Sequence, residues 1–86
     1  MKTKFADLGQ FLREKRESRR LTQADVADKL GCKSQFISNW ERGAASPPWK
    51  MLKAVIKMYK ISDKEIVRML VSDYERAVRR QLGLRK

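Results

Sequence analysis

Residues 21–43 of the chain read LTQADVADKLGCKSQFISNWERG, and their pattern is the strongest indication of the fold. Apolar residues recur in it at spacings of three and four, which is the period of a helix buried on one face. Glycines at positions 31 and 43 interrupt the pattern, because glycine readily takes the left-handed conformation that ends a helix. The stretch therefore predicts two short helices, at about residues 22–30 and 34–42, joined by Gly31, Cys32 and Lys33.

The sequence on either side follows the same period. A helix is predicted over residues 7–19, and another over residues 48–59 that begins at Pro48, a residue suited to a first helical position. A capping box of Ser62 and Glu65 opens a last helix that runs to about residue 82. We therefore predict an all-α fold: a compact five-helix domain spanning residues 1–86, with an extended C-terminal helix.

The apolar stripes indicate which residues fill the core. Phe36, Ile37 and Trp40 share one face of the third helix, and Trp49 lies on the stripe of the fourth, so we expect all four to be buried. The alternative for the tryptophans is an exposed stacking surface. Cys32 is expected to be a small, half-buried residue in the turn, with redox sensing as the alternative.

The charge of +11 limits the partners. Residues 1–21 carry +4, residues 22–43 carry no net charge, residues 44–61 carry +4 and residues 62–86 carry +3. A field of this sign concentrates polyanions around the protein. Nucleic acid, an anionic membrane and an acidic protein are all compatible with it, and nucleic acid is the first candidate.

The chain lacks the residues that several other classes of function require. The chain has one cysteine and no histidine, so neither a Cys–His nucleophile pair nor a Cys/His zinc site can form. No glycine-rich phosphate loop or paired-carboxylate cleft is visible either. We expect no enzymatic activity, no metal and no cofactor. No stretch is apolar enough for a membrane span or a signal peptide, so we expect no membrane partner and a cytoplasmic protein.

Two short helices with a glycine-first turn form a helix-turn-helix unit, here at about residues 23–42. Its elements LTQ, A-x-x-LG and IS-x-WERG, followed by a proline and an amphipathic helix, resemble the XRE-type family of phage repressors and Cro. The resemblance covers about residues 8–66. It implies a lambda-repressor-like fold and binding of double-stranded DNA through the second helix of the unit, in a bacterial or phage-encoded protein.

The resemblance also implies roles for individual residues. Base edges are expected to be contacted by Ser34, Gln35 and Asn39. The phosphates are expected to be contacted by Gln23, Lys33, Ser38, Arg42, Ser46 and Lys50. Arg16 and Glu41 are expected to form a structural ion pair. The alternative for the base-contacting set is an ordinary solvated helix face. Lys33 departs from the family, which usually has Ser or Thr at this helix cap, so the cap could shift to Ser34 and move the register by one residue.

The last helix carries a longer apolar stripe than a four-helix core needs. Tyr74, Ala77, Val78 and Leu82 form its end and are predicted to contact a second copy of the chain. Folding back, or fraying, is the alternative. The resemblance thus implies a transcriptional repressor that binds a pseudo-palindromic operator as a homodimer. A second hypothesis is an antitoxin-like or accessory DNA-binding protein that holds an acidic partner protein through its C-terminal helix.

Overall fold

The computed structural model describes residues 6–84, and within that range it contains five helices and no strand. The helices are α1 (Ala6–Ser18), α2 (Gln23–Leu30), α3 (Ser34–Glu41), α4 (Trp49–Tyr59) and α5 (Asp63–Leu82). The all-α prediction is therefore confirmed, and the helix boundaries lie within one or two residues of those expected. The remaining residues of the predicted 1–86 unit lie outside the described range.

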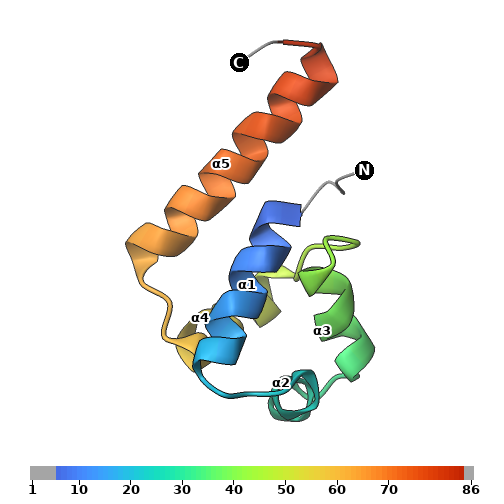
Figure 1. Cartoon of the computed structure of the whole chain (residues 1–86), viewed down its shortest axis with the longest axis vertical. Coiled ribbons are helices and arrows are strands. Elements are labelled where there is room, and N and C mark those ends of the chain that lie inside the picture. The colour runs from blue at the N-terminus through green and yellow to red at the C-terminus, as the bar shows by residue number, and fades with distance from the viewer. Residues whose placement is uncertain (1–5, 85–86) are drawn as a thin grey trace.

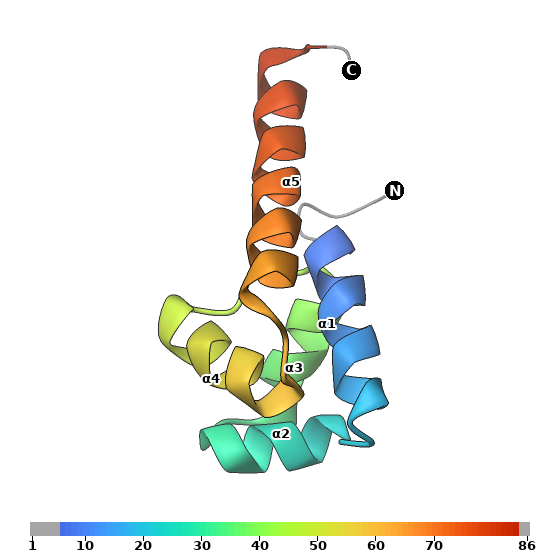
Figure 2. The same ribbon diagram turned by 90° about the vertical axis from the view of Figure 1, so that its left-hand side faces the viewer.

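Helices α1 to α4 form a body, from which α5 projects (Figures 1 and 2). The first turns of α5 lie beside α1, and its other end points away from the body, opposite α2 (Figure 2). The molecule is consequently elongated, with extents of 40 × 26 × 21 Å. None of the described helices is both long and apolar enough to cross a membrane.

Local capping explains where the helices begin and end. Thr22 and Asp25 form a complete capping box at the start of α2, and Ser62 and Glu65 form another at the start of α5. Gly31 ends α2 with a φ of 70°, in the left-handed region. Lys60 ends α4 with a φ of 55°, a conformation that costs a residue with a Cβ more than it costs glycine.

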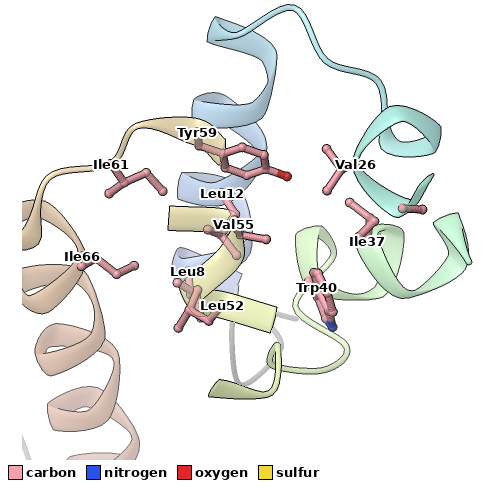
Figure 3. Packing of buried hydrophobic residues seen from close by; sticks show 11 residues of the cluster. Leu8, Leu12, Val26, Ile37, Trp40, Leu52, Val55, Tyr59, Ile61 and Ile66 are labelled. Carbon is pink, nitrogen blue, oxygen red and sulfur yellow. The ribbon is translucent and has the colours of Figure 1, made fainter. Parts of the chain in front are cut away.

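The core lies between α1 and α4 on one side and the helix-turn-helix unit on the other. Leu8 and Leu12 of α1 and Val55 of α4 face Val26 and Ile37 of the helix-turn-helix unit (Figure 3). Two core predictions were wrong. Phe36 is 50% exposed and Trp49 is 79% exposed, so the apolar stripe of each helix is wider than the part that packing buries. Trp40 is buried as expected.

Gly9 is buried where α1 crosses the end of α3. A Cβ at this position would lie 2.5 Å from the carbonyl oxygen of Trp40 and 2.6 Å from that of Glu41. The two backbones can therefore approach this closely only because residue 9 has no side chain. From sequence alone this glycine looks like a mere cost to the helix, but it sets how α1 packs.

Polar contacts fix the first half of α5 against α1. Asp73 accepts a hydrogen bond of 3.0 Å from the backbone N–H of Leu8, in the first turn of α1. Burial raises the pKa of the Asp73 carboxyl, and this hydrogen bond partly opposes the rise. Nearer the start of α5, Nζ of Lys15 lies 2.6 Å from Oε2 of Glu65, and this contact lowers the pKa of the Glu65 carboxyl. These contacts determine the direction in which α5 leaves the body.

Candidate nucleic-acid interface

A buried ion pair connects α1 to α3. The Nε atom of Arg16 lies 2.6 Å from Oε2 of Glu41, and its Nη2 lies 3.0 Å from Oε1, so the guanidinium and carboxylate meet side by side. Their side chains are 9% and 5% exposed. The hydrogen bond to Glu41 raises the pKa of Arg16. Arg16 also donates to the carbonyl of Leu21 at 2.7 Å, so this one side chain also anchors the segment just before α2.

Gln23 joins the same cluster at the start of α2. Its Nε2 donates to Oε1 of Glu41 at 3.0 Å. Gln23, Arg16 and Glu41 therefore tie α1, α2 and α3 together at one point. This contact was not predicted, because the family resemblance assigned Gln23 to a phosphate alone.

The outer face of α3 is polar and open to solvent. Ser34, Gln35 and Arg42 are exposed, whereas Ser38 and Asn39 are half-buried. Ile37 and Trp40 are 1% and 4% exposed on the opposite side. The helix thus presents one set of side chains to solvent and anchors itself with the other.

Lys33 occupies the cap position of α3 in extended conformation, and its side chain makes no capping hydrogen bond. The helix begins at Ser34. The cap therefore stays at Lys33 and does not shift to Ser34. At this cap no side chain accepts a hydrogen bond from the first backbone N–H groups of the helix.

Three side chains on this face are linked in a row. Nε2 of Gln35 donates to Oδ1 of Asn39 at 3.0 Å. Nη2 of Arg42 donates to the same oxygen. Positions 35, 39 and 42 are spaced by four and three residues, which stacks them on one side of the helix.

The remaining predicted phosphate contacts lie outside the helix-turn-helix unit. Lys50 is exposed in the first turn of α4. Ser46 is exposed in the loop before it, on the wall of a groove formed with α5. The structure therefore does not gather all the predicted phosphate contacts on the face of α3.

That groove is a second surface, which we call the α5 groove, with a volume of about 600 Å³. It is lined mainly by apolar side chains, among them Trp49, Leu70, Tyr74, Ala77, Val78 and Leu82. Tyr74 is 73% exposed and Leu82 is 67% exposed. Trp49 was not predicted here, and no feature of its spacing distinguished it from a core residue.

Comparison with known families identifies the unit. A family model described as a helix-turn-helix domain matches residues 7–69 of the chain. The chain belongs to this helix-turn-helix domain family. The match spans α1 to α4 and the first turns of α5, in agreement with the resemblance to the XRE-type family. A search of curated proteins and a search of solved structures each returned no match.

Membership of the helix-turn-helix family makes DNA the partner of this chain, because such units place their second helix in the major groove. In the described part of the chain that second helix is α3, which is anchored by Ile37 and Trp40 and polar on its outer side. No group of three or more Asp, Glu or Cys side chains in residues 6–84 is arranged to hold a metal ion.

Proposed function

We propose that the protein is a sequence-specific transcriptional regulator, a repressor that binds a pseudo-palindromic operator as a homodimer. The observation that carries the proposal is the outer face of α3, which is polar and solvent-exposed within a helix-turn-helix domain of a chain with charge +11. A major groove about 12 Å wide admits one helix with such a face. In this arrangement Ser34, Gln35 and Asn39 lie on the face of α3 that meets the base edges.

The phosphates on either side are held by polar groups around α3. Lys33, Ser38 and Arg42 supply contacts from α3 and its cap, and Ser46 and Lys50 supply them from the following loop and helix. Gln23 donates one amide hydrogen to Glu41. Because an amide nitrogen carries two hydrogens, the second serves a phosphate near the start of α2.

The homodimer forms through the α5 groove. Its support is the apolar surface of Tyr74, Ala77, Val78 and Leu82 on a helix that extends beyond the body, together with the exposed indole of Trp49. Exposed apolar patches of this kind mark protein interfaces. In the proposed dimer the two α3 helices occupy half-sites about one helical turn, roughly 34 Å, apart.

Sedimentation equilibrium of the protein with duplex DNA at two salt concentrations tests the proposal. We expect two chains per duplex and an affinity that falls with salt, with a log–log slope of about −0.9 for each phosphate neutralised. Lys50→Ala should weaken binding to all duplexes and flatten that slope, whereas Gln35→Ala should mainly relax sequence preference. A monomer that binds no duplex at low salt would contradict the proposal.

A second candidate function is favoured by α4. Lys50, Lys53, Lys57 and Lys60 are all exposed along it, a basic surface that suits an acidic protein partner. In this case the α5 groove holds that partner, and the chain acts as an antitoxin-like or accessory DNA-binding protein. A chain that stays monomeric on DNA while Trp49→Ala leaves DNA affinity unchanged would favour this function over the homodimer.

A further inference from the structure

The row of Gln35, Asn39 and Arg42 assigns different tasks to residues that the resemblance treats alike. Asn39 Oδ1 accepts two hydrogen bonds, one from Gln35 and one from Arg42. A carbonyl oxygen has two lone pairs, so this oxygen is saturated. The only groups that Asn39 has left to offer DNA are the N–H donors of its amide.

Arg42 sets the orientation of the whole row. A guanidinium has only donors, so the Asn39 atom that faces it must be the acceptor oxygen and not the amide nitrogen. The Gln35 atom that faces the same oxygen must then be a donor, which is Nε2. Both amides are thereby held in one of their two orientations by a charge at the end of the row.

This orientation determines which base each amide can read. A bidentate contact with adenine needs an amide oxygen to accept from N6 and an amide N–H to donate to N7. Asn39 cannot make it, because its oxygen is already used. Gln35 keeps its Oε1 and the second hydrogen of Nε2, which is the pair that adenine requires.

The same contact selects against guanine. Guanine presents two acceptors, O6 and N7, in the major groove, and a glutamine can satisfy both only with the two hydrogens of its amide nitrogen. Here one of those hydrogens is donated to Asn39. An unconstrained glutamine offers both edges, so holding the amide increases the preference for adenine.

We propose that Gln35 reads an adenine, that Asn39 is a positioning residue that holds the Gln35 amide, and that Arg42 fixes the orientation of Asn39. The proposal rests on the DNA-binding function proposed above and specifies the reading within it. Gln35 and Asn39 consequently act on the same base pair. If each residue read its own base, their effects would fall on different base pairs and would add.

The test begins with selection of the duplex that the full chain prefers, followed by replacement of each A·T pair by G·C. Affinities of Gln35→Ala, Asn39→Ala and the double variant are measured on every duplex by fluorescence anisotropy. We expect both single variants to lose preference at one common base pair, by roughly 5- to 150-fold, as expected for one bidentate contact. The double variant should lose no more than either single one.

Two further variants separate positioning from folding and from charge. Asn39→Asp keeps an acceptor for both neighbours, so it should retain the preference for adenine at that pair while weakening binding to all duplexes through repulsion of phosphates. Arg42→Ala should weaken all binding and also lower the preference at that pair. Lys50→Ala is the control, since it should weaken binding without changing the preference. Circular dichroism checks that each variant is folded.

Different failures have different meanings. Loss of preference at a second base pair in Asn39→Ala, additive with Gln35→Ala, would overturn the inference and make Asn39 a reader. An unchanged preference in Asn39→Ala would also overturn it, and the proposed DNA-binding function would still stand. A wild-type chain that binds all duplexes equally would overturn the proposed function, and this inference with it.

Discussion

The helix-turn-helix unit and the second half of α5 are built from the same apolar spacing, yet they differ in what covers it. In the unit, Val26 is fully buried and Ile37 is 1% exposed. In α5, Tyr74 and Leu82 are 73% and 67% exposed. Periodicity therefore shows which face of a helix is apolar, but it does not show that the chain itself supplies a partner for that face.

The polar groups differ in the same way. In the body, Arg16, Gln23 and Glu41 satisfy one another across three helices. No buried side-chain N or O atom in residues 6–84 lacks a hydrogen-bond partner. In the second half of α5, Arg76 pairs with Asp7 of α1, and Glu75 pairs with Arg79 one turn along the same helix. The body is thus complete in one chain, whereas the end of α5 offers an unfilled surface, and four predictions test this difference.

The largest effect is expected from Glu41→Ala. Removal of this carboxylate leaves the guanidinium of Arg16 buried without its partner, which costs about 3–5 kcal/mol of unfolding free energy. A domain of this size has only a few kcal/mol in reserve, so the variant should be largely unfolded at 25 °C. Urea unfolding followed by circular dichroism measures the change.

Glu14→Ala is the control for that prediction, because Glu14 is exposed on α1. We expect it to change stability by less than about 0.5 kcal/mol. Equal stability of the Glu41 and Glu14 variants would mean that the ion pair does not hold the body together.

The same substitution at two leucines compares the two regions directly. Leu12 is 2% exposed in the body, so Leu12→Ala should cost roughly 2–5 kcal/mol. Leu82→Ala should cost the single chain less than about 0.5 kcal/mol, because its side chain is already in solvent. Urea unfolding measures both.

Self-association measured by sedimentation should show the reverse order. Leu82→Ala should weaken the dimer, whereas Leu12→Ala should affect it only through unfolding. If Leu82→Ala destabilised the monomer as strongly as Leu12→Ala, the distinction drawn between body and α5 would be wrong.

A smaller loss is expected from Gly9→Ala. A methyl group here would push against the backbone of α3, and overpacking of this kind costs roughly 1–3 kcal/mol. The better helix propensity of alanine returns only about 1 kcal/mol of that loss. Thermal unfolding measures the effect, with Gln10→Ala at the exposed neighbouring position as the control. A Gly9→Ala variant more stable than the wild type would show that α1 and α3 can move apart without cost.

The smallest effect concerns the attachment of α5. The pKa of Glu65 is lowered by Lys15, so the carboxylate stabilises the folded chain above its ordinary pKa of 4.5, and this contribution is lost as the pH falls through the folded value. Unfolding free energies between about pH 5 and pH 2 should fall less steeply in Glu65→Gln than in the wild type.

Asp73→Asn provides a control of opposite sign. Burial raises the pKa of Asp73, so in the wild type its contribution to stability grows as the pH falls through the folded value. The Asp73→Asn variant lacks this gain and should lose stability more steeply on acidification. The same slope in both variants would refute the assignment of these shifts.

Most of the secondary structure could be predicted from the sequence. The capping box of Ser62 and Glu65 and the left-handed Gly31 act within a few residues, so they are visible in a short window of sequence. The pairing of Arg16 with Glu41 came only from the family resemblance, because nothing local joins two residues 25 positions apart.

The contacts that the sequence did not indicate all depend on the approach of separate elements. Gln23 meets Glu41 only after α2 packs beside α3, and Gly9 shows its purpose only where α1 crosses that helix. Trp49 was misplaced in the core because its spacing matches that of the buried Leu52. The row from Gln35 to Arg42 is local, but its hydrogen-bond directions required the side-chain geometry.

Periodicity, capping and motif spacing are local properties, so they were enough to predict the helices, their ends, the polar face of α3 and the family. The packing of the helices, in contrast, sets which apolar residues are covered and how Arg16 and Gln23 share the carboxylate of Glu41. It also leaves the end of α5 clear of the body (Figure 2). Burial depends on what packs against a residue, and that is set by segments far away in the chain.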